Sequence, residues 1–324
     1  MIKVAQMTEA GGPEVLGIAQ VDPVPLRAHE VRVRTAAAGV NFIDLYLRRG
    51  LYPTPHFPFV LGVEGAGVVE DVGPDVTMVE IGDPVAYAGP PVGSYATARV
   101  LSEARLIRVP DGVELEAAAG GLLRGLTAHM LLHAVRPLAA GDWVLVHAGA
   151  GGLGQMLIRW ARSLGARVVA SVGSPAKVAL AAAAGAEHVL LHPDPDLAEQ
   201  VKAVTGGAGV DVAYDGLGGT MLRKTFDCVR PFGTVVSLGE AAGPIPAVRV
   251  EELGPGRSLS PARPSVMAYA ADTARYRAAA QQVLARLQQG LPVEIGARYS
   301  LNDVAQAHRD LEAGRTTGSI ILTF

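Results

Sequence analysis

A glycine-rich segment, His147-Ala-Gly-Ala-Gly-Gly-Leu-Gly154, restricts the fold of this 324-residue chain more than any other feature. The apolar run Trp143-Val-Leu-Val146 precedes it, and apolar residues at helical spacing follow it as far as Gly165. A strand, a glycine turn and a helix in this order bring free backbone N–H groups to the positive end of a helix dipole, where a pyrophosphate can bind. The segment therefore predicts a dinucleotide site; a flexible loop between core elements is the alternative.

The next predicted strand, Arg167-Val-Val-Ala-Ser-Val-Gly173, bears on which dinucleotide binds. NAD sites place Asp or Glu at the ribose 2′-hydroxyl about 20 residues after the glycine turn. In this chain the corresponding stretch has no carboxylate and contains Ser171, Gly173, Ser174 and Lys177. Ser174 followed by proline is also typical of a helix start, but Lys177 in a first helical turn is opposed by the helix dipole unless a phosphate binds there. We therefore expect NADPH rather than NADH; an ordinary solvated charge is the alternative for Lys177.

Composition excludes several other classes of protein. The net charge of −3, without basic runs, gives little attraction to nucleic acid or to anionic lipid. No charge-free apolar run reaches about 18 residues and the first residues contain no signal-peptide core, so we expect no membrane insertion and a cytoplasmic location. The one cysteine, Cys228, cannot form an internal disulfide or a thiolate metal cluster, and is expected in the core near a helix end.

Two patterns divide the chain. Up to about residue 120, short apolar runs broken by Gly and Pro predict a compact β-rich domain. From about 123 to 270, strands alternate with helices, which predicts a parallel sheet. In this part Asp196 and Glu199 form a candidate capping box, and the Gly-, Pro- and Ser-rich stretch 253–264 is expected to be a loop. Two helices, 273–289 and 302–313, and a strand, 319–323, then return to the first domain.

Seven segments, taken in order, match a known family over nearly the full length. The chain resembles the zinc-free quinone oxidoreductases of the medium-chain dehydrogenase/reductase superfamily. The matching segments span residues 11–16, 39–46, 49–53, 61–69, 125–128, 147–154 and 262–265. The resemblance implies an α/β protein with a GroES-like β-rich catalytic domain, residues 1–122 completed by 272–324, and an inserted Rossmann domain, residues 123–271, with a doubly wound parallel sheet that binds NADPH. It also implies a homodimer or homotetramer.

The zinc-dependent alcohol dehydrogenases of the same superfamily differ from this chain at their metal ligands. They have Cys where this chain has Asn41 and His where it has Val63, and they share Glu64. Their structural zinc loop needs four cysteines, which this chain does not have. We therefore expect no metal. A metal-dependent alcohol dehydrogenase would need zinc ligands that the sequence does not offer, and an acceptor that takes hydride readily, such as a quinone or a conjugated enone, fits better.

The resemblance also implies the residues that contact NADPH. Asn41, Phe42, Ile43 and Thr127 are expected at the nicotinamide, Gly151, Gly152 and Leu153 at the pyrophosphate, and Gly173, Ser174 and Lys177 at the 2′-phosphate. Further contacts are expected from Leu217, Gly239, Glu240, Ala241, Arg263, Pro264 and Ser265. His192 stands where relatives have a Tyr beside the adenosine; it is expected either to stack or hydrogen-bond there, or to be an exposed loop residue.

Three side chains are candidates for work on the substrate. Tyr46 and Tyr52 carry phenols that keep their proton at neutral pH and can donate to an acceptor oxygen, and Asn41 can add an amide N–H. Aromatic packing is the alternative for both tyrosines. The leading hypothesis is an NADPH-dependent, metal-independent quinone reductase. A reductase of conjugated enones or alkenals and a non-catalytic NADPH-binding protein are the other hypotheses.

Overall fold

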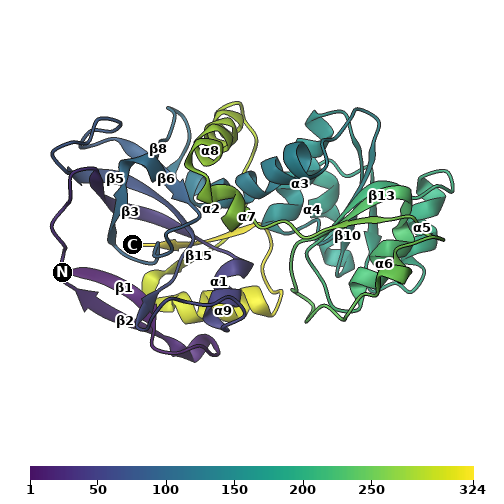
Figure 1. Ribbon diagram of the computed structural model, residues 1–324, viewed down its shortest axis with the longest axis horizontal. Helices are drawn as coiled ribbons and strands as arrows, with labels where there is room; N and C mark the ends of the chain where they lie inside the picture. The colour runs from purple at the N-terminus through teal and green to yellow at the C-terminus, as the bar shows by residue number, and fades with distance from the viewer. The chain divides into compact units, whose positions relative to one another are not determined.

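A computed structural model describes residues 1–324, which form two compact units (Figure 1). Unit 1 comprises residues 1–126 and 266–324, and unit 2 comprises residues 127–265. The division expected from the sequence differs from this one only in where it assigns residues 123–126 and 266–271. Unit 2 is therefore one continuous stretch of chain inserted into unit 1.

Unit 1 is built on two β-sheets. The smaller has the order β2 (Leu16–Val21), β1 (Ile2–Met7), β4 (Phe59–Val60). The larger has the order β15 (Ile295–Ser300), β16 (Ser319–Thr323), β3 (Glu30–Val40), β5 (Glu64–Val72), β6 (Pro84–Ala88), β8 (Ile107–Arg108), and β7 (Ala98–Ser102) also pairs with β3. Strand β16 runs antiparallel to β3, with Ile320 opposite Val40. The end of the chain thus returns to the first domain, as the sequence predicted.

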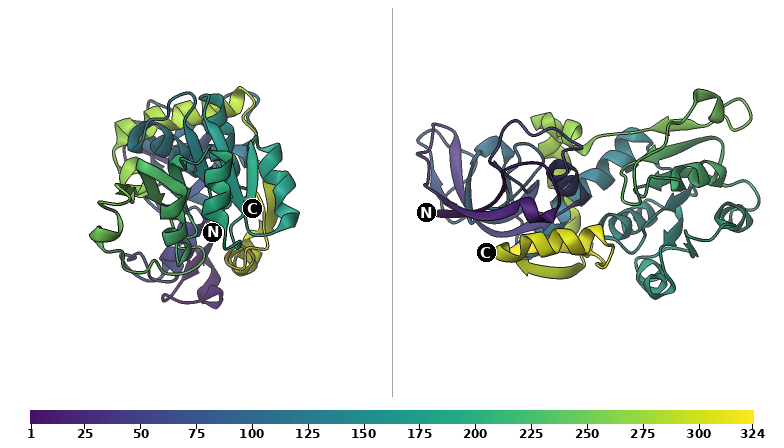
Figure 2. Two further views of the ribbon diagram at one scale, coloured as in Figure 1. Left: turned by 90° about the vertical axis from the view of Figure 1, so that its right-hand side faces the viewer. Right: turned by 90° about the horizontal axis from the view of Figure 1, so that it is seen from below.

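Helices and a valine-rich core complete unit 1. The helices are α1 (Phe42–Arg48), the first part of α2 (Leu115–His129), α7 (Val266–Ala271), α8 (Thr273–Gln288) and α9 (Val304–Glu312). Helices α1 and α9 lie side by side, as Figure 1 and the right-hand view of Figure 2 show. Alternate residues of β3 point inward, so Val31 and Val33 are buried against Val69 of β5 and Val85 of β6. At the other end of this strand pair Gly39 lies opposite Glu64, which brings Asn41 and Glu64 close together.

Unit 2 is a doubly wound sheet of six parallel strands. Their order is β11 (His188–Leu191), β10 (Arg167–Val172), β9 (Trp143–Val146), β12 (Val210–Asp215), β13 (Val229–Ser237), β14 (Ser260–Ala262). Every pairing is parallel. The chain winds outward from β9 in one direction and then returns to β12 to wind in the other. The order therefore reverses between β9 and β12, and ligands of such sheets bind at the carboxyl ends of the strands beside that point.

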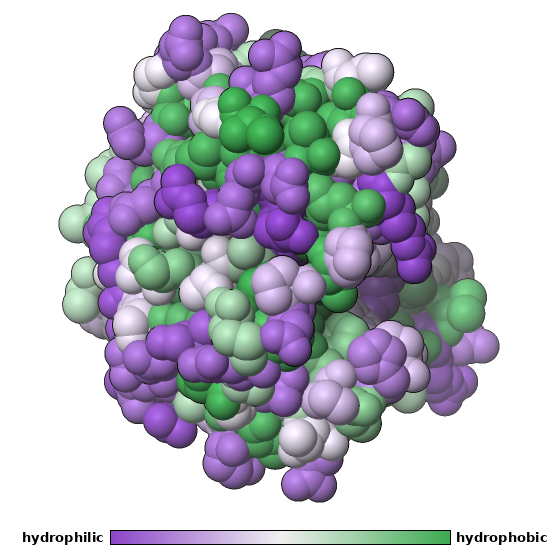
Figure 3. Space-filling view, turned by 90° about the vertical axis from the view of Figure 1, so that its left-hand side faces the viewer, coloured by the Kyte–Doolittle hydropathy of each residue, from purple (hydrophilic) through white to green (hydrophobic).

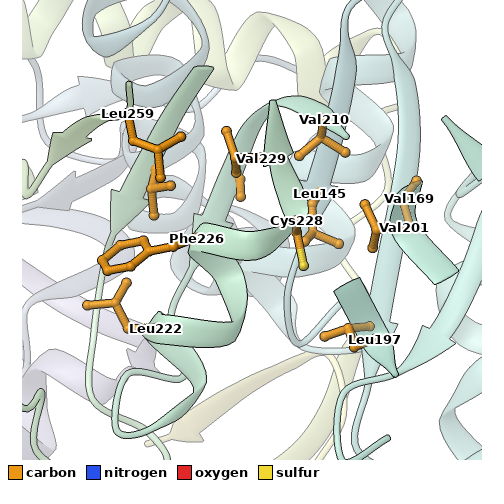
Figure 4. Close-up of a cluster of buried hydrophobic side chains, with 12 residues drawn as sticks. Leu145, Val169, Leu197, Val201, Val210, Leu222, Phe226, Cys228, Val229 and Leu259 are labelled. Atoms are coloured by element: carbon orange, nitrogen blue, oxygen red, sulfur yellow. The ribbon is translucent and has the colours of Figure 1, made fainter. Parts of the chain in front are cut away.

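Four helices cover this sheet and enclose its core. They are α3 (Gly152–Ser163), α4 (Val178–Ala183), α5 (Leu197–Val204) and α6 (Met221–Cys228); α3 packs against α4, and α5 against α6. Figure 4 shows Phe226 and Cys228 of α6 among aliphatic side chains of the strands and of α5. Cys228 is fully buried at the end of α6, which confirms its predicted place. The α/β class and the parallel sheet are also confirmed.

Two local predictions are wrong in whole or in part. In the stretch 253–264, expected to be a loop, residues 253–259 lie in no helix or strand, but residues 260–262 form strand β14, which hydrogen-bonds in register with Thr234–Val236 of β13. Asp196 does precede helix α5, but its side chain makes no capping hydrogen bond, and its own N–H donates instead to the Asp194 carboxylate. The capping box with Glu199 therefore does not form.

The surface is mixed in character. Figure 3 shows one face, on which hydrophilic side chains cover much of the area and hydrophobic ones gather mainly towards the top. The largest apolar side chains that remain exposed include Ile81, Phe232 and Val250, which lie in different segments. None of the helices has the length and apolar character needed to cross a membrane.

Candidate functional site

The expected cofactor residues of unit 2 gather at one edge of its sheet. Because all six strands are parallel, their carboxyl ends meet along a single edge. The glycine turn follows β9, and the segments that begin at Gly173, His192, Leu217, Gly239 and Arg263 follow β10, β11, β12, β13 and β14. Five chain segments far apart in the sequence therefore join the glycine turn to form one candidate site.

The glycine turn combines tight packing with open space. A Cβ on Gly154 would lie 2.3 Å from the Ala148 carbonyl oxygen, and one on Gly149 would lie 2.9 Å from the Ala170 Cβ. These two glycines let helix α3 approach β9 and β10. Gly151 precedes α3 as its N-cap, with no side-chain cap, and a Cβ there would meet only the Ala148 oxygen at 3.3 Å. The start of the twelve-residue helix is thus open to an anion at Gly151, Gly152 and Leu153.

The segment after β10 forms the expected 2′-phosphate region. Ser174 is the N-cap of a short 3₁₀ turn, Pro175–Lys177, that leads into α4, so the predicted helix start at Ser174 and the proline after it is confirmed. A Cβ on Gly173 would lie 3.2 Å from His192 Nε2. The imidazole of His192 therefore lies directly beside this segment, although 19 residues separate the two in the sequence.

The loops after β12, β13 and β14 contact one another. The backbone N–H of Ala241 donates to the Gly216 carbonyl over 3.2 Å. The Arg263 guanidinium donates to Ser237 Oγ at 2.9 Å and to the Glu240 carboxylate at 3.0 Å. Leu217 is buried, whereas Ala241 and Ser265 are exposed. These contacts bring together the expected residues Leu217, Gly239, Glu240, Ala241, Arg263, Pro264 and Ser265; Thr127 lies in α2, half-buried, at the start of unit 2.

A buried chain of polar side chains runs beneath this edge. His147 Nδ1 lies 2.5 Å from Ser171 Oγ, and Ser171 Oγ lies 3.4 Å from His192 Nδ1. On the other side, His147 Nε2 lies 2.9 Å from Thr225 Oγ1, and Thr225 donates to Asp215 Oδ2 at 3.0 Å. The chain joins the ends of four neighbouring strands.

Asp215 ends this chain at the loop after β12. Its Oδ1 accepts the backbone N–H groups of Leu217 at 2.8 Å and Gly218 at 3.0 Å. The carboxylate therefore holds the start of a loop that belongs to the candidate site. These bonds give Asp215 a structural role at that loop.

In unit 1, the expected nicotinamide residue Asn41 lies in a cluster of buried charges. Its Nδ2 donates to Glu64 Oε1 at 2.8 Å, and the Arg124 guanidinium donates to the same oxygen at 3.1 Å. The Leu123 N–H donates to Glu64 Oε2 at 2.7 Å. Burial raises the pKa of Glu64, and the charge of Arg124 opposes that rise. Gly39 makes room for the carboxylate, because a Cβ there would lie 2.2 Å from Glu64 Oε1.

Asp44 links this cluster to helix α1. The backbone N–H of Asn41 donates to Asp44 Oδ2 at 2.8 Å, and the Asp44 N–H donates to the Asn41 carbonyl. These bonds fix the first turn of α1, which also carries Phe42 and Ile43, both half-buried. Asp44 is fully buried, and burial raises its pKa to about 7. A carboxyl group that titrates near neutral pH thus lies directly behind Asn41.

The two candidate tyrosines form an aromatic pair at the other end of α1. The rings of Tyr46 and Tyr52 meet edge to face with centroids 5.7 Å apart. Tyr46 is buried, whereas 40% of Tyr52 is exposed. The packing offered as the alternative to a catalytic role is therefore present, and Tyr52 is the more accessible of the two phenols.

The positions that correspond to the zinc ligands of the alcohol dehydrogenases are also defined. Asn41 has its amide engaged by Glu64, and Val63 is fully buried. No group of three or more His, Cys, Asp or Glu side chains is arranged to hold a metal ion.

Sequence reasoning missed two of these arrangements. Arg124 as the partner of Glu64, and His147 with Thr225 beneath the cofactor edge, were not identified. One signal was present, because His147 and Asp215 each end a predicted strand of a parallel sheet and such ends converge.

Comparison with known proteins agrees with the fold of both units. Residues 27–111 match the alcohol dehydrogenase GroES-like domain, and residues 152–283 match a domain described as zinc-binding dehydrogenase. A quinone oxidoreductase of Pseudomonas aeruginosa is 41% identical over 323 residues, which is 99% of each chain. A 2-haloacrylate reductase of Burkholderia sp. is 37% identical over 330 residues, again 99% of each. The crystal structure of Escherichia coli quinone oxidoreductase complexed with NADPH has a TM-score of 0.95 at 34% identity and covers 99% of this chain and 100% of its own.

A GroES-like unit with an inserted dinucleotide-binding sheet, together with these matches, defines an oxidoreductase of the medium-chain dehydrogenase/reductase class. Within that class the chain belongs to the quinone oxidoreductase family, as the resemblance implied. The chain is therefore an enzyme, and the hypothesis of a non-catalytic binding protein is wrong.

Proposed function

We propose that the chain transfers reducing equivalents from NADPH to a quinone without the help of a metal. The observation that carries this proposal is the edge of the unit 2 sheet, where an open helix start at Gly151 lies beside a segment, Gly173–Lys177, that has no carboxylate. A pyrophosphate fits the first feature and a 2′-phosphate fits the second. The NADPH named in the structure of the Escherichia coli relative supports the choice of cofactor.

In this proposal the residues of unit 2 bind and orient the cofactor. Gly152 and Leu153 offer backbone N–H groups to the pyrophosphate, and Gly151, whose own N–H donates to the Ala148 carbonyl oxygen at 2.9 Å, leaves room for it. Gly173, Ser174 and Lys177 face the 2′-phosphate. Leu217, Gly239, Glu240, Ala241, Arg263, Pro264, Ser265 and Thr127 supply the remaining contacts. When bound, reduced nicotinamide supplies a hydride to the acceptor.

The residues of unit 1 act on the substrate. An acceptor oxygen that gains negative charge needs a hydrogen-bond donor. Tyr52 has a partly exposed phenol, and Asn41 retains a second amide N–H besides the one given to Glu64. Phe42 and Ile43, with Asn41, are proposed to line the nicotinamide, and Tyr46 to support Tyr52 by ring packing.

The test is an NADPH-oxidation assay of chelator-treated protein with 1,4-benzoquinone, a 2-alkenal, and an alcohol with NADP⁺. We expect turnover with the quinone and none with the alcohol. Tyr52→Phe should lower kcat for the quinone and leave KM for NADPH unchanged. Oxidation of the alcohol that appears only after zinc is restored, with no reduction of the quinone, would show the proposal to be wrong.

Cofactor choice has its own test. Lys177→Ala should raise KM for NADPH by about tenfold and leave KM for NADH nearly unchanged, because only NADPH carries the extra phosphate. Lys202→Ala is the matched control, since Lys202 lies on α5 and pairs with Glu199 at 3.1 Å. An equal effect of Lys177→Ala on both cofactors would contradict the assignment.

A second acceptor class has specific support. The Burkholderia relative is named for the reduction of 2-haloacrylate, a conjugated alkene, and it is nearly as similar as the quinone oxidoreductase from Pseudomonas aeruginosa. A conjugated enone or alkenal accepts hydride in the same way, so the alkenal in the assay decides between the two. A homodimer or homotetramer remains our expectation for the assembly.

A further inference from the structure

The buried polar chain of unit 2 fixes where its protons lie. Thr225 has one hydroxyl proton, and its Oγ1 lies 3.0 Å from Asp215 Oδ2 and 3.1 Å from the Met221 carbonyl oxygen. The Met221 carbonyl oxygen has no proton and can only accept. The Asp215 carboxylate accepts two backbone N–H groups through Oδ1 and accepts here through Oδ2. The hydroxyl proton of Thr225 is therefore taken, and toward His147 Thr225 can only accept. It follows that His147 carries its proton on Nε2.

The same logic continues to the other ring nitrogen. Burial lowers the pKa of His147, so the ring is neutral and its Nδ1 holds a lone pair. Ser171 must then donate its hydroxyl proton to His147 Nδ1, over 2.5 Å. With that proton used, Ser171 can only accept from its second neighbour, His192 Nδ1, at the longer distance of 3.4 Å. His192 therefore carries its proton on Nδ1.

The other ring nitrogen of His192, Nε2, is therefore an acceptor. Burial lowers the pKa of His192 to about 4, helped by His147, Lys177 and Lys224 and opposed by Asp215. The ring is thus neutral near pH 7, and Nε2 holds a lone pair. Nε2 is the atom beside Gly173, where the 2′-phosphate is proposed to bind. A lone pair that faces a phosphate is repulsive, whereas one that faces a ribose hydroxyl accepts its hydrogen bond.

We propose that His192 determines cofactor specificity through a proton: Nε2 takes up a proton from solvent when the 2′-phosphate binds, and the imidazolium then donates to that phosphate. With NADH the ring stays neutral and accepts from the ribose 2′-hydroxyl. Ser171 is a positioning residue, because its one proton is donated to His147, so it can only accept from His192 and thereby keeps the proton of the neutral ring on Nδ1. The inference rests on the proposed NADPH site and adds to it a pH dependence, with NADPH preference falling as the pH rises.

The test counts protons on binding, independently of activity. NADP⁺ and NAD⁺, which differ only in the 2′-phosphate, are titrated calorimetrically into the whole chain at about pH 6 in two buffers of different ionisation enthalpy. His192→Gln is the matched control, because its amide can donate from about the place of Nε2 but cannot titrate. We expect the wild type to take up about half a proton more than His192→Gln with NADP⁺, since a nearby phosphate raises a histidine pKa by about 1–3 units. With NAD⁺ the two proteins should not differ.

Two further results decide the matter. In the free protein, ¹⁵N NMR should find His192 with its proton on Nδ1 and His147 with its proton on Nε2. Ser171→Ala should lower the proton uptake with NADP⁺ while binding persists, because the ring is then free to place its own proton on Nε2. Tight NADP⁺ binding with equal proton uptake in wild type and His192→Gln would overturn this inference alone. No binding of NADP⁺ at all would overturn the proposed function and this inference with it.

Discussion

Each unit has a glycine next to buried polar side chains, and the two sites use that glycine differently. In unit 1 the space beside Gly39 is filled by the chain's own carboxylate, Glu64, which is paired with Arg124. In unit 2 the space beside Gly151 stays open, and the polar chain below it is neutral apart from Asp215. In unit 1 the ion pair of Glu64 and Arg124 thus holds Asn41 at the start of helix α1. Unit 2 fixes its loops with neutral groups and leaves backbone N–H groups for a ligand.

The largest expected effect comes from breaking the charge pair of unit 1. Arg124→Met leaves Glu64 buried without its counter-charge, and should lower the free energy of unfolding by about 3–5 kcal/mol, measured by urea denaturation. The double variant Arg124→Met with Glu64→Gln is the control, because it removes the stranded charge. It should recover much of the loss, and a double variant as unstable as the single one would contradict the charge argument.

Asp44 of unit 1 should also make the stability depend on pH. In the folded protein Asp44 keeps its proton to about pH 7, whereas its ordinary pKa is 3.8. The folded state binds more protons at Asp44 between these values, so the contribution of Asp44 to the free energy of unfolding should fall by up to about 4 kcal/mol as the pH rises from about 4 to 7. His192 and His308, whose pKa burial lowers to about 4 and about 3, contribute in the opposite direction. Asp44→Asn mimics the protonated carboxyl, so its stability relative to the wild type should rise with pH over this range. A pH dependence unchanged in Asp44→Asn would assign it to other groups.

A smaller effect is expected in the neutral chain of unit 2. Thr225→Val leaves His147 Nε2–H and Asp215 Oδ2 without their shared partner, which should cost about 1–3 kcal/mol. Thr225→Ser keeps the hydroxyl and should be close to wild type in urea denaturation. If Thr225→Val lost as much free energy of unfolding as Arg124→Met, the proposed difference between the charged site of unit 1 and the neutral site of unit 2 would be wrong.

The smallest effects should separate the two glycines. Gly39→Ala forces a methyl group against Glu64 and should lower stability by about 1–3 kcal/mol. Gly151→Ala adopts the same φ of −77° without strain, so the fold should be retained. Its methyl group occupies the place proposed for the pyrophosphate and should weaken NADP⁺ binding about tenfold, measured by fluorescence titration. The reverse pattern would show that Gly151 is structural and that the open space has no ligand.

The sequence predicted unit 2 better than unit 1, for physical reasons. The strands and helices of unit 2 have regular apolar periodicity and are separated by glycine turns, so most of them were located from local pattern alone. Unit 1 depends on pairings such as β16 with β3, whose register joins residues about 280 positions apart. For unit 1 the local pattern predicted a β-rich domain and the return of the end of the chain, whereas only the family resemblance predicted the GroES-like fold. Strand β14 was missed because its Gly- and Pro-rich surroundings look like a loop, and only the neighbouring strand β13 makes it a strand.

The candidate site divides in the same way. The glycine turn and the segment Gly173–Lys177 were found because each is a short continuous motif. The chain from His192 to Asp215 was not found, because its five side chains come from five separate segments and no spacing in the sequence relates them. Only the parallel topology brings them together. His192 was named from the family resemblance, but the hydrogen bonds that link it to Asp215 are visible only in three dimensions.

The position of β16 has a consequence for how the chain is made. This strand, residues 319–323, lies between β15 and β3 in the larger sheet of unit 1. During synthesis β3 therefore has an exposed edge until these residues leave the ribosome. Unit 2 is continuous and is complete well before that moment, so it can fold first and present its dinucleotide edge while unit 1 still waits for its last strand. A nicotinamide dinucleotide that binds this edge would then stabilise the nascent chain before unit 1 is complete.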